Sequence, residues 1–323
     1  MLRAWFERND LDGLELVALN ELADLQTLAH LTRYDSTHGR FAGSVEVQAA
    51  GLVINGKRLA VSNIADLHQL PWQQHGVDLV MECTGTFTDR ARAEIHLQRG
   101  SQRVLFSQPA AADVDATIVY GVNHHTLKSS HRIISNASCT TNCIVPVIDA
   151  LHKAVGIEHG VITTIHSAMN DQPVLDAYHH TDLRKTRSAM HSIIPVDTGL
   201  ARGIDRLLPM LAGRFQAQAM RVPTMNVSAI DLSVVVQKVV DRETINMVLQ
   251  QAAQLYPEGV LGYTSEPLAS CDFNHDARSG IVDLSQTRVS GTNLVKVLVW
   301  FDNEWAFANR MLDVARLLSQ LKP

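Results

Sequence analysis

Strand-like and helix-like segments alternate along the first half of the chain. Apolar runs typical of strands occupy residues 14–20 and 77–83, and apolar side chains at helical spacing follow each of them, in residues 21–31 and 89–100. Further strand-like runs occupy residues 103–106 and 117–122. This alternation predicts a mostly parallel sheet with helices on its faces, which is an α/β fold.

The pattern changes near residues 136–140, where longer strands with fewer intervening helices predict a second, α+β domain. The expected strands are 160–167, 227–240 and 293–301, and the expected helices are 139–156, 241–256 and 302–321. Pro146 lies inside the first of these helices and predicts either a kink or a late start. Asp241 is expected to cap the second helix.

Size and composition agree with two domains and exclude several classes of protein. A chain of 323 residues exceeds one ordinary core. No apolar run approaches the ~18 residues of a membrane helix, and the charged start "MLRAWFERND" does not resemble a signal peptide. The net charge of −5 argues against a nucleic-acid partner. We therefore expect a cytoplasmic protein without a nucleic-acid or membrane partner, whose four cysteines are reduced.

The stretch "SNASCTTNC" (135–143) contains the first candidate for chemistry, Cys139. Polar N-cap residue types precede it and an apolar run follows, so Cys139 is expected in the first turn of a helix. Unpaired N–H groups and the helix dipole there would lower the pKa of its thiol. Three other readings stay open: a structural buried thiol, a zinc site shared with Cys143, or a local disulfide. No further ligands stand at a metal-ligand spacing, so no metal is expected.

The stretch "TTIHSAMNDQ" (163–172) places His166 at the end of a strand, where polar residues follow. A cysteine and a histidine are the minimum for thiol catalysis, because the imidazole can hold the thiolate and handle protons. The alternative is a structural histidine whose ring only makes hydrogen bonds at the end of the strand.

Four segments in this order carry a family resemblance: "SNASCTTNC", "TTIHS", "RVPTMNVSAIDLSV" and "WFDNEWAFANRM". Together they resemble the glyceraldehyde-3-phosphate dehydrogenase family. Within it, "NELAD", "HSAMNDQ", "SIIPVDTGLARG" and "DFNHDARSGIVDLSQTRVSG" are most similar to the D-erythrose-4-phosphate dehydrogenase branch. The resemblance implies a doubly wound, Rossmann-type NAD-binding domain (1–138), a catalytic domain (139–304) and a C-terminal helix (305–323) that packs back on the first domain. It also implies a homotetramer.

The resemblance assigns roles to residues at matching positions. Cys139 would attack the substrate aldehyde, and His166 would take the hydroxyl proton while NAD accepts hydride. The implied contacts to the phosphorylated aldehyde are Ser138, Thr140, Arg184, Lys185, Thr198, Gly199 and Arg221. The implied contacts to NAD are Glu21, Thr84, Gly85, Ser107 and Asn303. An acid at Glu21 disfavours the 2′-phosphate of NADP.

Three departures from the family pattern bear on these expectations. Met169 replaces a hydroxyl residue of the glycolytic enzymes, and Gly199 replaces a lysine of the erythrose branch. The G-x-G-x-x-G turn that binds the NAD pyrophosphate is absent, because no two of the 18 glycines stand two residues apart. We expect a start assigned about 20 residues too far downstream; the alternative is a truncated product with impaired NAD binding. Either would leave the doubly wound sheet without its first strand.

The expected reaction is the NAD-dependent oxidation of D-erythrose 4-phosphate to 4-phospho-D-erythronate, a step toward pyridoxal phosphate. Two alternatives stay open at this point. One is a glycolytic-type glyceraldehyde-3-phosphate dehydrogenase. The other is a non-catalytic binding or regulatory protein that has lost NAD binding.

Overall fold

The computed structural model describes residues 1–49, 51–179 and 181–321, and the chain divides into two compact units. Unit 1 comprises Met1–Ile118, His124–Ser138 and the chain from Ala308 onward. Unit 2 comprises Val119–Asn123 and Cys139–Phe307.

Aspartate caps fix where several helices begin. The helices of the described residues are α1 (Leu2–Glu7), α2 (Leu25–Arg33), α3 (Arg90–Gln98), α4 (Cys139–Val155), α5 (Leu200–Leu207), α6 (Arg242–Leu255) and α7 (Trp305–Gln320), with 3₁₀ turns at η1 (Leu67–Gln69), η2 (His124–Thr126), η3 (Leu183–Thr186), η4 (Pro209–Leu211) and η5 (Ser270–Phe273). Asp24 accepts a hydrogen bond from the backbone N–H of Thr27, so α2 begins at residue 25 and not at 21 as expected. Asp241 caps α6 in the same way, through the N–H of Thr244, which confirms the predicted cap.

Unit 1 contains two four-stranded sheets and a short hairpin. One sheet has the order β1-β6-β5-β4 and the other, all parallel, has the order β7-β8-β10-β9. Their strands are β1 (Ala18–Asn20), β4 (Val45–Gln48), β5 (Gly51–Ile54), β6 (Lys57–Ser62), β7 (Leu79–Glu82), β8 (Arg103–Phe106), β9 (Ala116–Thr117) and β10 (Ile133–Ser135); the hairpin is β2 (Tyr34–Asp35) with β3 (Gly39–Arg40). Among the described residues, β1 and β7 each end their sheet, β1 beside β6 and β7 beside β8.

The parallel sheet confirms the Rossmann-like α/β class of the first half, but two of its details differ from expectation. The pairs β4–β5 and β5–β6 are antiparallel, so this half is mixed rather than mostly parallel. The expected strand 117–122 is also wrong beyond Thr117. Residues 119–123 form a turn in which the N–H groups of Val122 and Asn123 both donate to the carbonyl of Val119. Ile118 and Val119 are fully buried, and a short buried apolar run cannot be told from a strand by its pattern alone.

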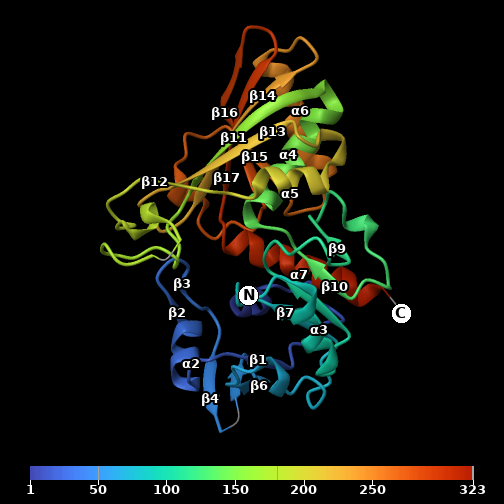
Figure 1. Cartoon of the computed structure of the whole chain (residues 1–323), viewed down its shortest axis with the longest axis vertical. Coiled ribbons are helices and arrows are strands. Elements are labelled where there is room, and N and C mark those ends of the chain that lie inside the picture. Colours follow the sequence, from blue (N-terminus) through green and yellow to red (C-terminus); the bar gives the residue numbers. More distant parts are fainter. Residues whose placement is uncertain (50, 180, 322–323) are drawn as a thin grey trace. The chain divides into compact units, whose positions relative to one another are not determined.

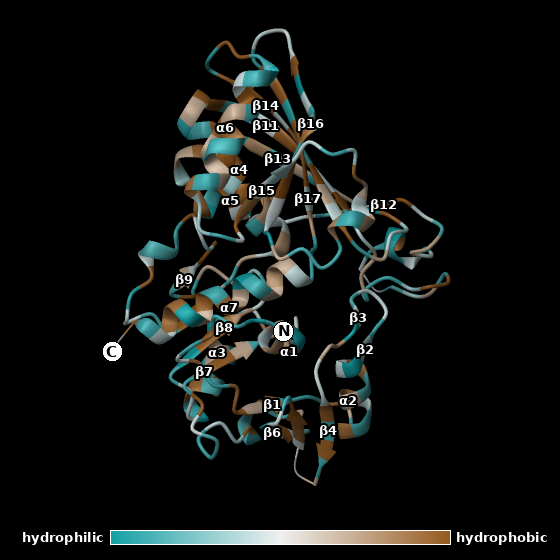
Figure 2. Ribbon diagram, turned by 180° about the vertical axis from the view of Figure 1, so that it is seen from behind, coloured by the Kyte–Doolittle hydropathy of each residue, from teal (hydrophilic) through white to brown (hydrophobic). Residues whose placement is uncertain are grey.

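Unit 2 is built on one seven-stranded mixed sheet of order β12-β13-β11-β14-β17-β16-β15 (Figure 1). Its strands are β11 (Ile157–His166), β12 (Ile194–Val196), β13 (Phe215–Arg221), β14 (Ser228–Val236), β15 (Leu261–Thr264), β16 (Gly280–Ser290) and β17 (Leu294–Phe301). The long strands and mixed pairing confirm the α+β character of the second half. Helices α4, α5 and α6 pack against this sheet, and its apolar strands are visible in Figure 2.

Alternation along the strands separates a buried face of this sheet from an exposed one. Ile162, Leu232 and Val297 are essentially inaccessible, whereas Val161 on the opposite face is 58% exposed. Helix α4 begins at Cys139 even though Pro146 lies within it, so of the two expectations for Pro146 the late start is wrong. The nucleophile candidate therefore stands at the first residue of a long, buried helix.

A buried ion cluster fixes the second part of α7 within unit 1. The carboxylate of Asp313 lies 2.7 Å from a guanidinium nitrogen of Arg8 and 2.7 Å from one of Arg310. Asp313 and Arg310 are both almost fully buried. Asp10 pairs with Arg8 at 2.6 Å from the outside, where half of its side chain remains exposed.

Candidate active site

A sharp turn between β10 and α4 sets the position of Cys139. Ala137 adopts φ +57°, a left-handed conformation that costs a residue with a Cβ about 1 kcal/mol. Its N–H is bound by the hydroxyl of Ser135 at 3.1 Å. This turn lets the chain pass from a strand into a helix within three residues.

Cys139 and His166 are brought together within unit 2. The Sγ atom of Cys139 lies 3.9 Å from Nε2 of His166, which is the last residue of β11. The sulfur and the imidazole are therefore in contact, and this pairing of two residues 27 positions apart is the arrangement that thiol catalysis needs.

The pKa of Cys139 corrects the expectation of a thiolate. Burial raises the pKa of the thiol to about 11, although the backbone N–H of Thr140 and the charge of Arg221 act in the opposite direction. The position at the helix start is as expected, but desolvation outweighs it. The thiol is therefore neutral at pH 7 in this structure. Cys143, one turn further along, is fully buried with a pKa well above its ordinary value, as suits an inert thiol.

His166 is held on its other side by Arg221. The two residues are directly paired in the parallel ladder of β11 and β13. A guanidinium nitrogen of Arg221 lies 2.6 Å from Nδ1 of His166. Burial and the charge of Arg221 lower the pKa of His166 to about 4, so the ring is neutral at pH 7.

The other residues expected at the substrate phosphate lie near helix starts or in an exposed loop. Ser138 and Thr140 flank Cys139 and are half-buried. Gly199 is the N-cap of α5, and the hydroxyl of Thr198 accepts a hydrogen bond from the N–H of Leu200 at 3.2 Å. Both residues therefore stand at the start of α5.

Arg184 and Lys185 belong to the 3₁₀ turn η3 and differ in their surroundings. The ammonium of Lys185 pairs with the carboxylate of Asp171 at 2.9 Å, so much of its charge is matched. Arg184 is exposed, and its backbone N–H donates to the carboxylate of Asp182 at 2.9 Å. Asp171 interacts electrostatically with Arg221 and His166 and was missed in the sequence.

Two buried hydroxyls orient the amide of Asn303. Ser167 and Ser228 both donate to its Oδ1, at 2.9 and 2.8 Å. Ser228 also accepts the N–H of Ser167 at 3.1 Å. Reversing the amide would leave the hydroxyl hydrogen of Ser167 without this acceptor, so Oδ1 faces inward and Nδ2 is left to donate to a ligand.

The residues expected to contact NAD in unit 1 stand at the carboxyl ends of strands. Glu21 follows β1 and is exposed; its Oε1 accepts the N–H of Leu22. Thr84 and Gly85 follow β7, and Ser107 follows the neighbouring strand β8. The N–H of Ser107 donates to the carbonyl of Glu82 at 3.0 Å.

A buried relay supports the turn at Thr84. The carboxylate of Glu82 accepts the N–H of Thr84 at 2.7 Å and lies 3.4 Å from Nε2 of His96. Nδ1 of His96 in turn accepts from the indole N–H of Trp72 at 3.0 Å. Burial acts to raise the pKa of Glu82, but hydrogen bonds from His96 and Thr84 outweigh it and the pKa is lowered. Glu82 is therefore an ionised group inside unit 1.

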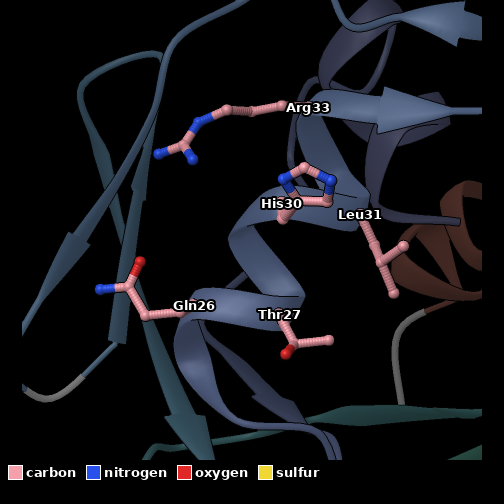
Figure 3. A pocket seen from close by; sticks show the side chains of 5 residues that line it. All are labelled: Gln26, Thr27, His30, Leu31 and Arg33. Atoms are coloured by element: carbon pink, nitrogen blue, oxygen red, sulfur yellow. The ribbon is translucent and has the colours of Figure 1, made fainter.

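One hollow of the described residues lies on α2, apart from Cys139 and His166. The hollow in Figure 3, of about 380 Å³, is lined by residues of α2: Gln26, Thr27, His30, Leu31 and Arg33. Their side chains point to opposite sides of the helix and do not converge on a ligand. In the described part of the chain, no three His, Cys, Asp or Glu side chains group as a metal site would require. No helix there has the length and apolar character to cross a membrane.

Two family models match the chain. The model of the glyceraldehyde 3-phosphate dehydrogenase NAD binding domain matches residues 1–90, and the model of the C-terminal domain of the same family matches residues 138–303. The second match spans Cys139, His166, Arg221 and Asn303 and covers more than half of the chain. The first identifies NAD as the cofactor. The chain therefore belongs to the glyceraldehyde-3-phosphate dehydrogenase family and carries its NAD-dependent oxidoreductase domains.

Proposed function

We propose that this chain oxidises D-erythrose 4-phosphate to 4-phospho-D-erythronate with NAD, and that the product feeds pyridoxal phosphate biosynthesis. The supporting observation is the row formed by Cys139, His166 and Arg221, with 3.9 Å between the first two and 2.6 Å between the last two. A thiol, an imidazole and a guanidinium in contact provide a nucleophile, a proton acceptor and an anion ligand.

The proposed reaction proceeds through a thioester. The sulfur of Cys139 bonds to C1 of the aldehyde, and the thiol proton ends on the new hydroxyl. NAD, when bound, supplies the acceptor for the hydride of C1. His166 takes the hydroxyl proton as the C=O bond of the thioester forms. Water then cleaves the carbon–sulfur bond, which releases the carboxylate and restores the thiol.

We propose that the phosphate of the substrate binds to Arg221 and to the start of α5. Arg221 offers a planar fork of donors. Thr198 and Gly199 precede α5, whose first backbone N–H groups favour an anion. Ser138 and Thr140 would complete the ligand set on either side of Cys139, and Arg184 and Lys185 would add positive charge from the exposed turn.

Met169 supports the erythrose substrate over the triose. It follows His166 by three residues, and its side chain is 43% exposed. A thioether does not donate a hydrogen bond to a phosphate oxygen. The hydroxyl that glycolytic relatives carry at this position can donate, so its loss disfavours the binding mode of the shorter triose phosphate.

The test compares turnover of the two phosphorylated aldehydes with and without inorganic phosphate. We expect a higher kcat/KM for D-erythrose 4-phosphate, with turnover that does not require inorganic phosphate. Met169→Thr should shift the preference toward the triose. Met190→Thr, a change at a similarly exposed methionine (42%), should leave the preference unchanged. Triose turnover that strictly requires phosphate would contradict the proposal and support the glycolytic type.

The residues present fit the nicotinamide and the ribose of NAD better than its pyrophosphate. Asn303 presents a free amide donor suited to the nicotinamide carboxamide, and Glu21 presents an exposed carboxylate suited to ribose hydroxyls. The pyrophosphate has no G-x-G-x-x-G turn in the sequence. We propose residues 1–138 with residues 305–323 as the NAD-binding part and residues 139–304 as the catalytic part. The Arg8–Asp313 ion pair supports this grouping.

A second candidate function is that of a folded protein that does not bind NAD. Calorimetric titration of the full chain with NAD separates the two. Binding in the micromolar range supports the dehydrogenase. A folded chain without measurable heat of binding supports the non-catalytic alternative.

We also propose that the chain assembles as a homotetramer. The exposed face of the unit 2 sheet carries Val161, Ile165 and Leu294, which are large apolar side chains open to solvent. Val161→Glu should dissociate an assembly that uses this face, as measured by light scattering. A monomer in the unmodified chain would contradict the proposal. The cytoplasmic location stays a prediction.

A further inference from the structure

Nδ1 of His166 lies within hydrogen-bond distance of one donor and one acceptor. A guanidinium nitrogen of Arg221 lies 2.6 Å away, and the carbonyl oxygen of Ser167 lies 2.9 Å away. The guanidinium can only donate a hydrogen bond, and the carbonyl can only accept one. Nδ1 therefore satisfies one neighbour at a time: it is bare when it accepts from Arg221, and it carries hydrogen when it donates to Ser167.

The shorter contact decides the state in this structure. With Arg221 donating to Nδ1, the hydrogen of the neutral ring must reside on Nε2. The ring is only 6% exposed, and the low pKa of His166 keeps it neutral at pH 7. Nε2 is the nitrogen that faces Cys139. In this state it can donate to the sulfur, but it has no lone pair with which to accept a proton.

That state is the wrong one for the oxidation step proposed above, in which Nε2 must take a proton from the thiohemiacetal hydroxyl. The carbonyl of Ser167 makes the other tautomer possible. If Arg221 withdraws, Nδ1 can carry the hydrogen and donate to the carbonyl of Ser167, which already lies within hydrogen-bond distance. Nε2 then becomes an acceptor without any movement of the ring.

Arg221 has donors to spare for an anion. Its Nε is buried and has no hydrogen-bond partner among the described residues. Its neighbour Asp171 is already paired with Lys185 at 2.9 Å. An incoming phosphate group would offer the guanidinium a doubly charged, multidentate partner in place of a neutral ring nitrogen.

We propose that Arg221 is a positioning residue that couples phosphate binding to the tautomer of His166. Without an anion, Arg221 occupies Nδ1 and holds the hydrogen on Nε2. When a phosphate group engages Arg221, one proton leaves Nε2 and one binds Nδ1 through solvent, so the ring stays neutral and Nε2 becomes the base. This inference rests on the proposed function, since the anion is taken to be the phosphate of the substrate.

The test is nitrogen-15 NMR of the full chain with labelled histidine and arginine, at pH 7.5, titrated with inorganic phosphate. The bare and the protonated nitrogen of a neutral imidazole give well-separated signals. We expect the free chain to show Nδ1 bare and Nε2 protonated. At saturating phosphate the two positions should exchange, and the Arg221 Nε signal should move with the same midpoint.

Two variants sharpen the test. Arg221→Met should give the Nδ1-protonated ring without any phosphate. Arg288→Met removes an exposed arginine of the same sheet and should leave both the free state and the exchange unchanged. Should Arg221→Met fail to fold, the phosphate titration of the unmodified chain still decides.

Three results would overturn the proposal: Nδ1 protonated in the free chain, an Arg221 signal that phosphate moves while the ring keeps its tautomer, or an Arg221 signal that phosphate leaves unmoved. The proposed function fails separately. If neither aldehyde is oxidised and the ring still exchanges with phosphate, the coupling stands and the substrate assignment is wrong.

Discussion

The Nε2 atom of His166 lies 3.9 Å from the Sγ atom of Cys139, yet this contact does not ionise the thiol. The imidazole is itself neutral, because burial and Arg221 lower its pKa to about 4. A neutral ring offers a dipole rather than a full charge, and the helix start alone does not offset desolvation of the sulfur. The ligand-free structure therefore holds Cys139 as a neutral thiol.

Alkylation of Cys139 in the ligand-free chain should accelerate with pH. Since the thiolate reacts and the pKa is about 11, the rate should rise about tenfold per pH unit from pH 7 to pH 10. Peptide mapping by mass spectrometry after iodoacetamide treatment measures it, with the exposed Cys271 as internal reference and the buried Cys143 unlabelled. A rate already at its plateau below pH 8 would show that the thiolate forms without ligands.

The neutral state of His166 should make stability depend on pH. Its pKa is about 4 when folded against an ordinary 6.5, so the unfolded chain takes up the proton first as pH falls. Stability should therefore drop between pH 6.5 and 4, by up to about 3 kcal/mol, and level off below. Urea unfolding at several pH values checks this. His166→Gln should flatten the curve, and His159→Gln, at an exposed position of the same strand, should not.

Asp313 and Asp10 contact the same arginine, but they should differ in their contribution to stability. Asp313→Ala leaves Arg8 and Arg310 facing each other in a buried site and should lower the free energy of unfolding by about 3–5 kcal/mol. Asp10→Ala removes a half-exposed partner and should cost no more than about 1 kcal/mol. Equal losses in chemical denaturation would contradict the assignment of α7 to a buried ion cluster.

Ser228 should contribute both to the free energy of unfolding and to NAD binding. Ser228→Ala leaves the buried N–H of Ser167 without its acceptor and should cost about 1–3 kcal/mol of stability. Ser233→Ala, on the half-buried face of the same strand, should stay within about 0.5 kcal/mol. Thermal unfolding measures both; in addition, a higher KM for NAD is expected only for the first variant, because the amide of Asn303 loses one of its two anchors.

Local signals predicted much of the fold and the two central site residues. The capping side chain of Asp241 predicted the start of α6. Cys139 and His166 lie in segments whose residue types are typical of a nucleophile at a helix start and of a histidine at a strand end. The hairpin β5–β6 was overlooked although its signal is strong: Asn55 and Gly56 both have positive φ, as an Asn-Gly turn between strands requires.

The rest depended on contacts that are distant in sequence. Ser228 reaches Asn303 only because β14 and β17 pair in a register that sets Ser228 opposite Phe301. The pKa of Cys139 depends on how completely the fold encloses its sulfur, and no local pattern reports that. The competition between Arg221 and the carbonyl of Ser167 for Nδ1 of His166 likewise depends on the pairing of β11 with β13.

The relay from Thr84 through Glu82 and His96 to Trp72 also gives the chain a built-in optical probe. The indole N–H of Trp72 is bonded to a ring whose far side meets the carboxylate that supports the Thr84 turn. Any rearrangement of that turn redistributes charge next to the indole. In a chain whose other three tryptophans are replaced by phenylalanine, the emission wavelength of Trp72 should therefore report events at the end of β7.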